Sequence, residues 1–332
     1  MYIFIDETGA FQTPARSQRI SAVAALVIPE SFAKTLFRRF RALVAPWRNG
    51  NPEVKGSSLV ESQMAEVIRT ITRFEVLLFV VAIDMSLHTT AGIVAHRDEQ
   101  AGKVREAAAR VLNPELKSRL DALADQLGRL SVQLYAQSAV LTSLLQAVLE
   151  SSTLYYVQRN PKTLGSFTWR IDGKDMQVTP YEQMWRQIVG PLLQTRSLAR
   201  PLWQLEGADY SAFNRYCGGF PEAPAHLRSR IAESTEPFLY VDTQELLRDL
   251  RFTASHRLTG LQMVDILAAG VRRALNNTLG RAGWSGIGRL MPHPPRGSNC
   301  VKFLALEDLP DVDIPYAGIV KEWNRVTRRM VV

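Results

Sequence analysis

The chain has 332 residues, of which 46% are hydrophobic and 22% charged, and this composition excludes a disordered, collagen-like or purely coiled-coil protein. Its 40 Lys and Arg residues outnumber its 32 Asp and Glu residues, which gives a net charge of +8. Such a balance favours a polyanionic partner, most commonly nucleic acid, although a solvated basic surface gives the same sum. Only Cys217 and Cys300 are present, so a disulfide framework and a four-cysteine zinc site are excluded and a cytoplasmic location is expected.

The sequence predicts neither membrane insertion nor secretion. The longest strongly apolar run, residues 76–83, is far too short to cross a bilayer. No apolar N-terminal segment has the form of a signal peptide, because acidic residues follow Met1 within a few positions. We therefore expect no membrane partner.

The N-terminal quarter of the chain predicts strands separated by helices. Residues 2–6 form a β-prone apolar run without polar alternation, which is typical of a strand covered on both faces. A short polar connection joins this run to the next one, and it predicts an antiparallel pair. The predicted elements are strands at 2–6, 20–28 and 74–83, and helices at 31–46 and 59–72.

A long helical region is expected from residue 86 to 157, with a break at Asn113-Pro114. Its second half carries an a/d heptad seam between residues 116 and 155, in which Gln137 is the polar exception. Two interpretations are open: an internal helical hairpin, which we favour, or an arm for a homodimer or a protein partner. The seam residues are Leu116, Leu120, Leu123, Leu127, Leu130, Leu134, Leu141, Leu144, Val148 and Tyr155.

The second half of the chain predicts further strands at 167–172, 201–205 and 238–241. Helices are expected at 181–189, ending at Gly190-Pro191, and at 259–271, whereas residues 280–297 have a loop composition. We expect an α/β domain over residues 1–275, interrupted by a coiled-coil-like hairpin insert at 86–160. A loop-rich extension, 276–332, is expected to pack on the same domain.

Carboxylates stand at the ends of three predicted strands, namely Asp6, Asp84 and Asp172. A fourth, Asp265, lies in an otherwise apolar helical segment. Parallel strands bring their terminal side chains to one sheet edge, where gathered carboxylates attract a hard cation such as Mg²⁺ or Mn²⁺. Such metals activate water and stabilise the leaving oxygen in phosphodiester cleavage.

Each of these aspartates also has a purely structural interpretation. Asp84 is suited to capping a following helix, and Asp172 before a glycine is typical of a turn. Asp6 could accept backbone hydrogen bonds from the turn after it. Asp265 is harder to explain structurally, because an unpaired buried carboxylate is unfavourable.

Two further groups add polar chemistry. In the segment Glu53-Val54-Lys55-Gly56-Ser57, Glu53 could bind metal, Lys55 could hold a phosphate, and Gly56 would allow a close backbone approach. Gln262 lies three residues before Asp265 and therefore projects from the same helix face. A generic polar loop and an exposed glutamine are the alternatives.

Four segments resemble motifs of the domain-of-unknown-function 3800 family of bacteria and phages. In chain order they are residues 2–9 (YIFIDETG), 53–56 (EVKG), 170–174 (RIDGK) and 260–268 (GLQMVDILA). The resemblance covers roughly residues 1–275. Thr8 stands where the family usually has serine, and Asp84 matches only by its position at a strand end.

The resemblance implies a ribonuclease H-like mixed sheet flanked by helices and a metal-dependent acidic site. We therefore expect a Mg²⁺- or Mn²⁺-dependent nuclease acting on nucleic acid. The expected metal ligands are Asp6, Glu7, Glu53, Asp84, Asp172 and Asp265, with Lys55 stabilising phosphate charge and Gln262 orienting a ligand. The alternative is a non-catalytic nucleic-acid-binding or scaffold protein that uses the helical arm to bind a partner.

Overall fold

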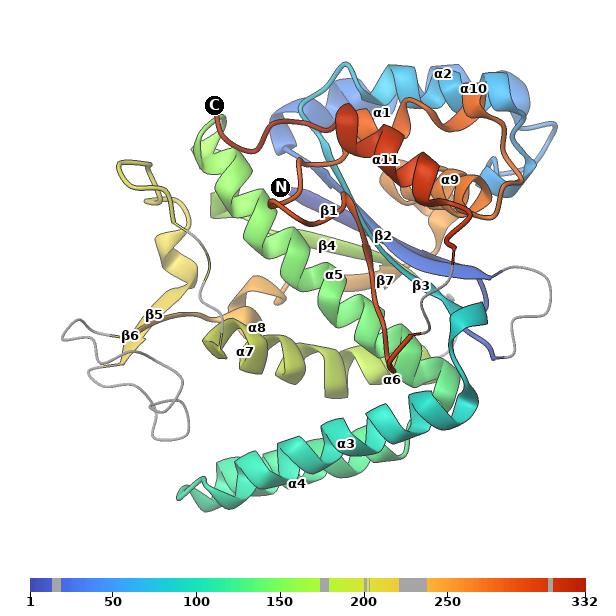
Figure 1. The fold of residues 1–332 in the computed structure, drawn as a ribbon. Helices are drawn as coiled ribbons and strands as arrows, with labels where there is room; N and C mark the ends of the chain where they lie inside the picture. The colour runs from blue at the N-terminus through green and yellow to red at the C-terminus, as the bar shows by residue number, and fades with distance from the viewer. Residues whose placement is uncertain (14–18, 174–178, 200–201, 203, 221–237, 310–312) are drawn as a thin grey trace.

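A computed structural model gives the fold of residues 1–332 and describes all of them except 14–18, 174–178, 200–201, 203, 221–237 and 310–312. The protein is an α/β structure in which helices flank a mixed six-stranded sheet (Figure 1). Strand order in this sheet is β7-β4-β1-β2-β3-β8, and β5 and β6 form a separate two-stranded sheet. The strands are β1 (Tyr2–Thr8), β2 (Ile20–Ile28), β3 (Leu77–Asp84), β4 (Thr168–Asp172), β5 (Cys217–Phe220), β6 (Phe238–Val241), β7 (Leu250–Thr253) and β8 (Val301–Phe303).

Within the six-stranded sheet only β2 runs against its neighbours. It pairs antiparallel with β1 and β3, as the short connection after β1 predicts, whereas β4 is parallel to β1, and β7 is parallel to β4. β8 adds a parallel edge strand beside β3. The carboxyl ends of β1, β3, β4 and β7 therefore lie at one edge of the sheet.

Helices cover both faces of the sheet. One face is covered by α1 (Glu30–Val44), α2 (Glu61–Ile71) and α9 (Thr259–Leu275), with buried residues of α11 (Ala317–Arg325) in the same core. The other face is covered by α5 (Val132–Val157), with α6 (Pro180–Met184), the π-helical turn η5 (Trp185–Val189) and α7 (Gly190–Ala199) beside it (Figure 1). Alternate residues of each strand thus enter two different hydrophobic cores.

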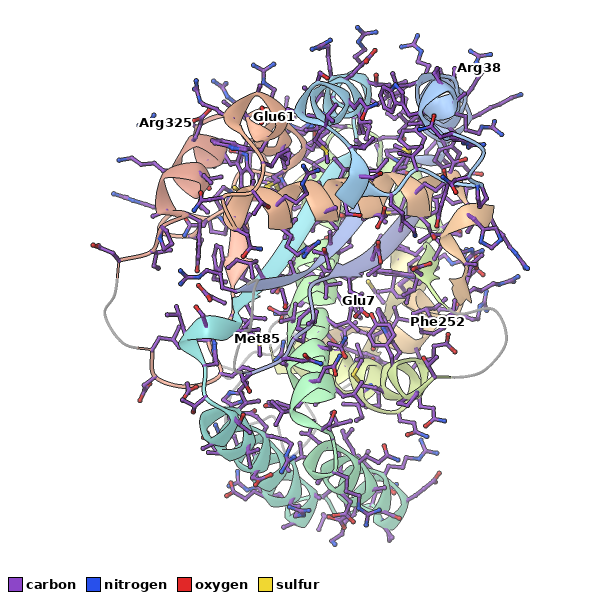
Figure 2. All side chains as sticks on the ribbon, turned by 90° about the vertical axis from the view of Figure 1, so that its right-hand side faces the viewer. Glu7, Arg38, Glu61, Met85, Phe252 and Arg325 are labelled. Carbon is purple, nitrogen blue, oxygen red and sulfur yellow. The ribbon has the colours of Figure 1, made fainter. Side chains whose placement is uncertain are left out.

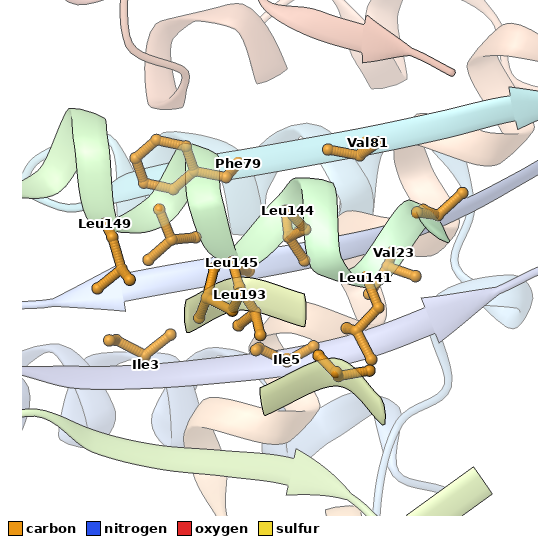
Figure 3. Close-up of a cluster of buried hydrophobic side chains, with 14 of the residues drawn as sticks. Ile3, Ile5, Val23, Phe79, Val81, Leu141, Leu144, Leu145, Leu149 and Leu193 are labelled. Atoms are coloured by element: carbon orange, nitrogen blue, oxygen red, sulfur yellow. The ribbon is translucent and has the colours of Figure 1, made fainter. Parts of the chain in front are cut away.

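Helix α5 is the central helix of the second core. Its leucines pack against β1, β2 and β3, in one cluster with Ile3, Val23 and Phe79 (Figure 3). By length and composition alone α5 could span a membrane, but 67% of its most apolar window is buried inside the fold. The sheet that it covers therefore accounts for its apolar character.

The helical insert differs from its prediction. The seam breaks after α4 (Pro114–Gly128), and Ser131 caps α5 by accepting a hydrogen bond from the Leu134 N–H at 3.3 Å. Only α3 (Thr90–Ala109) and α4 form a projecting hairpin, here called the arm (Figure 1). From Leu141 to Tyr155 the seam is buried against this chain's own sheet, so that half presents no surface for a homodimer or a partner.

Three other elements depart from the sequence expectations. The helix from Pro180 continues through Gly190-Pro191 to Ala199, with the π-helical turn η5 directly before the proline that lacks an N–H. The predicted loop at 280–297 contains α10 (Arg281–Trp284) and the 3₁₀ turn η9 (Ile287–Leu290). The strand expected at 201–205 falls partly on residues outside the described ones, and its described positions are not in a strand.

The C-terminal extension is part of the main fold. β8 joins the sheet, and Trp323 of α11 is fully buried and donates a hydrogen bond from Nε1 to the Trp284 carbonyl at 3.0 Å. The remaining elements are the short helix α8 (Thr243–Leu246) and several 3₁₀ turns, of which η2 (Gly56–Ser58) and η8 (Ser255–Arg257) matter for the site.

Candidate functional site

The end of β1 places two adjacent carboxylates on opposite faces of the sheet. β1 continues to Thr8, so the strand has not ended at Asp6, and consecutive side chains alternate. Asp6 follows Phe4 on the α9 face, whereas Glu7 follows Ile5 on the α5 face, at the edge of the sheet (Figure 2). Asp6 is 8% exposed, and its Oδ1 accepts a hydrogen bond from the Glu7 N–H at 2.8 Å.

Strand register brings Asp172 beside Asp6. Ile5 pairs with Ile171 in the parallel β1–β4 ladder, so the next residue of each strand, Asp6 or Asp172, projects to the opposite face at the same level. Asp172 is the last residue of β4, and Gly173 follows it directly against β7. A Cβ at Gly173 would lie 2.8 Å from the Phe252 Cβ, so the chain needs glycine to turn here.

Helix α9 brings Asp265 to the same place. Its second residue, Gly260, lies so close to the ring of Phe4 that a Cβ would be 2.3 Å from it. The helix then rises about 7.5 Å over five residues, while β1 advances about 6.6 Å from Phe4 to Asp6. The contact at Gly260 therefore sets Asp265 over Asp6.

The loop before α2 closes the site from a third side. The Gly56 N–H donates to Oδ2 of Asp265 at 2.9 Å. A Cβ on Gly56 would lie 2.6 Å from the Ile266 Cα and 2.7 Å from the Ala269 Cβ, so only glycine allows this approach to α9. Arg273 fixes the loop further, donating from Nη1 to the carbonyls of Gly56 at 3.2 Å and Leu59 at 2.7 Å.

Lys55 is held at the edge of the cluster by Glu53. The two side chains form an ion pair at 2.6 Å, and the Ser255 hydroxyl donates to the other oxygen of Glu53 at 2.8 Å. Partial burial acts to raise the pKa of Glu53, but the hydrogen bonds from Lys55 and Ser255 lower it, and the net shift is downward. Both oxygens of Glu53 are thus engaged, and its position suits it to orient Lys55 rather than to bind metal.

Burial is the first cause of the raised pKa of each of the three aspartates. For Asp6 the pKa is raised well above its ordinary value, first by burial and then by repulsion from Asp265 and Asp172. Burial also raises the pKa of Asp265 and of Asp172, against the opposing attraction of Lys55. Burial acts to lower the pKa of Lys55, but the hydrogen bond to Glu53 and the negative charge of Asp265 raise it, and the net shift is upward. The site therefore holds more negative charge than its one lysine balances, which is the condition under which a cation binds.

Glu7 has a separate environment that was not predicted. Gln137 of α5 donates from Nε2 to Oε2 of Glu7 at 3.0 Å, and Tyr181 is a second hydrogen-bond partner. Burial and repulsion from Asp172 raise the pKa of Glu7 to about 7, against the hydrogen bonds from these two side chains. The signal for Gln137 was present in the sequence, since it is the one polar interruption of the heptad seam and is only 5% exposed.

Gln262 acts through the neighbouring turn. Its Nε2 donates to the His256 carbonyl at 3.3 Å and, more weakly, to the Ser255 carbonyl at 3.5 Å, which fixes η8 against α9. Ser255 in turn donates its N–H to Asp172 and its hydroxyl to Glu53. Gln262 is therefore a positioning residue in this arrangement, and no sequence signal indicated Ser255.

Asp84 lies apart from the other aspartates. In the β2–β3 ladder it pairs with Ile20, four residues along β2 from the position opposite Asp6, which is about 13 Å of strand. Its Oδ2 accepts from Arg19 at 2.7 Å and from the Tyr316 hydroxyl at 3.2 Å, and its Oδ1 accepts from the Ser86 hydroxyl. The structural interpretation, a residue that caps the turn after β3, accounts for these contacts.

The donor set suits a hard cation. Among the described residues, no group of three or more His, Cys, Asp or Glu side chains is arranged as a formed metal site. The chemistry of Asp6, Asp172 and Asp265 nevertheless fits Mg²⁺ or Mn²⁺, because all three offer carboxylate oxygens and their mutual repulsion is what a cation relieves.

Comparisons with known proteins add no further information about this chain. No family model, no curated protein and no solved structure matches it. The site has therefore to be interpreted from its own geometry.

Proposed function

We propose that the protein is a Mg²⁺- or Mn²⁺-dependent enzyme that cleaves phosphodiester bonds in nucleic acid. The observation that carries this proposal is the gathering of Asp6, Asp172 and Asp265, which come from two strands and a helix far apart in sequence. All three are partly or largely buried at one sheet edge, where burial disfavours the charge of each, and repulsion from neighbouring aspartates adds to this at Asp6 and Asp172. Native proteins keep such an arrangement where function requires it.

Each residue has a distinct role in this proposal. Asp6, Asp172 and Asp265 would hold the metal, which when bound supplies an activated water and stabilises the leaving oxygen. Lys55, whose side chain is half exposed, faces a phosphate oxygen and balances its charge. Glu53 and Ser255 orient Lys55, and Gly56 fixes the carboxylate of Asp265 through its N–H.

The order of elements supports a ribonuclease H-like fold. A β-hairpin start, a third strand on its far side, a parallel strand bearing Asp172 and then a helix bearing Asp265 is the order that the family resemblance implies. The net charge of +8 supports a polyanionic substrate.

The direct test is Mn²⁺ binding by calorimetry, combined with cleavage of labelled DNA and RNA. Wild-type protein should bind Mn²⁺ and cleave, and Asp6→Asn and Asp265→Asn should lose both while melting at or above the wild-type temperature. Asp84→Asn is the matched control, because it removes a strand-end carboxylate that lies outside the site. Cleavage that persists in chelator, or in both site variants, would contradict the proposal.

A non-catalytic role is the second candidate, and one feature of the arm favours it. At the tip of the arm Leu112 is 94% exposed and Leu116 is 41% exposed, so the tip presents two leucines to solvent that a partner could cover. In that case nucleic-acid or partner binding would survive both chelation and Asp6→Asn. Gel shifts with and without chelator separate the two candidates.

A further inference from the structure

Arg272 of α9 is a half-buried cation whose head group lacks a partner among the described residues. Its Nε is buried without a hydrogen-bond partner among the described residues. Burial, together with repulsion from Arg273, lowers the pKa of Arg272. A buried, unpaired donor on a charged group is unfavourable, so this one calls for a ligand that supplies an acceptor.

Arg272 and Asp265 lie on the same side of α9. They are seven residues apart, which is close to two helical turns and about 10.5 Å along the axis. Between Gly260 and Leu275 every residue is buried except these two and Arg273. Helical side chains lean toward the N-terminus, so the guanidinium of Arg272 leans toward Asp265, whose charge raises the pKa of Arg272.

The neighbouring arginine has a different task. Arg273 donates hydrogen bonds to the carbonyls of Gly56 and Leu59 in the loop before α2. Gly56 also lies so close to Ile266 and Ala269 that a Cβ on it would clash, so the same loop covers that side of α9. On its other side α9 packs on β1 and β2 through residues such as Leu261 and Val264. Arg272 and Asp265 thus lie on the strip of α9 between the loop and the sheet, which begins at the acidic cluster.

We propose that Arg272 binds a backbone phosphate next to the scissile one, and so selects a nucleic-acid strand over a small phosphodiester. This inference rests on the proposed function. A guanidinium is suited to this task, because its planar set of donors matches phosphate oxygens. The phosphate would also supply the acceptor that the buried Nε lacks.

The test is the binding of a short fluorescein-labelled single-stranded oligonucleotide, followed by anisotropy over a series of KCl concentrations with Mn²⁺ present. Replacing Arg272 by Gln should weaken binding about tenfold at moderate salt and make the salt dependence shallower by about one phosphate contact, roughly 0.7 in log–log slope. The lysine variant R272K should keep the wild-type slope, since the charge is retained, while losing part of the affinity. Arg119→Gln is the control for charge alone, because Arg119 lies on the arm and is 71% exposed.

Cleavage assays give a second, independent readout. With bis(4-nitrophenyl) phosphate, which carries a single phosphodiester, Arg272→Gln should turn over like wild type, whereas its kcat/KM for the oligonucleotide should fall about tenfold. Equal losses on both substrates, or an unchanged salt slope, would overturn the proposal for Arg272. If wild-type protein cleaves neither substrate but Arg272→Gln still makes the salt dependence of oligonucleotide binding shallower, the phosphate contact stands and the catalytic proposal fails. Because the Arg272 head makes no described hydrogen bond, Arg272→Gln is expected to melt near the wild-type temperature.

Discussion

Replacing Gly56 by alanine tests whether the loop before α2 really determines the geometry of the site. The new Cβ would lie 2.6 Å from the Ile266 Cα, 2.7 Å from the Ala269 Cβ and 2.9 Å from the Asp265 carbonyl oxygen. Two of these are backbone atoms of α9, a helix packed on the sheet, so the loop has to move rather than the helix. The loop then carries the Gly56 N–H away from Asp265.

The expected loss of stability follows from these contacts. Overpacking at a rigid contact costs about 1–3 kcal/mol, and weakening a hydrogen bond to a charged acceptor costs about 1.5–3 kcal/mol when it is lost entirely. Restricting the unfolded chain by replacing glycine offsets about 0.4–1 kcal/mol of this. We expect a net loss of about 2–3 kcal/mol. For a chain of 332 residues the unfolding entropy is about 0.7 kcal/mol per kelvin, so the melting temperature should fall by about 3–4 °C.

The measurement is a thermal melt together with a Mn²⁺ titration. Gly102→Ala is the matched control, because Gly102 lies inside α3 and a Cβ there would meet no atom within 4 Å. That variant should be slightly more stable than wild type, by about 0.4–1 kcal/mol. The Gly56→Ala variant should also bind Mn²⁺ at least about tenfold more weakly, since Lys55 and the Asp265 carboxylate lose their fixed positions. If it melts like the Gly102 variant and binds Mn²⁺ like wild type, the loop does not determine the site.

Three further predictions concern charge and packing. The pKa of Glu7 is raised to about 7, so the charge of Glu7 costs stability above pH 7 and nothing below about pH 4.5. In chelator, Glu7→Gln should therefore be more stable than wild type at pH 8, by up to about 3 kcal/mol, and equal to wild type at pH 4.5. Denaturant melts at both pH values measure the difference. Asp84→Asn should lose about 2–3 kcal/mol, because the ion pair with Arg19 is mostly buried, and should keep wild-type Mn²⁺ affinity in calorimetry. Leu144→Ala should cost about 2–5 kcal/mol in urea unfolding and Leu116→Ala less than about 0.5; equal costs would contradict the placement of α5 in the core.

Asp6 and Asp172 were predictable because apolar runs stop at them, although β1 itself continues to Thr8. The end of each apolar run fixes the position of its carboxylate along the strand, and the α/β topology then brings both carboxylates to one edge of the sheet. The same reasoning could not separate Asp84 from them. Its partners Arg19 and Tyr316 come from distant parts of the chain, and only their placement shows that its charge is already neutralised.

The heptad seam shows a different limit of sequence reasoning. A repeat of leucines specifies that one side of a helix is buried, but a sheet and another helix both satisfy that requirement. Here the seam divides at Ser131: Leu123 and Leu127 are buried within the α4 part, whereas Leu141 and Leu144 are buried against the sheet. Periodicity carries no information about which surface covers the apolar side, so the length of the insert was overestimated.

The polar break in that seam connects the two cores of the molecule. Because side chains alternate along β1, Asp6 can face α9 only if Glu7 faces α5, whose buried Ser138, Thr142 and Thr153 hydroxyls donate to carbonyls of their own helix. Leucine at position 137 would leave the Glu7 carboxylate without its hydrogen bond from α5, and an acidic residue there would repel it. Glutamine is neutral and supplies an N–H donor to Oε2. The requirement for a carboxylate pair at the end of β1 thus explains a residue 130 positions later in the sequence.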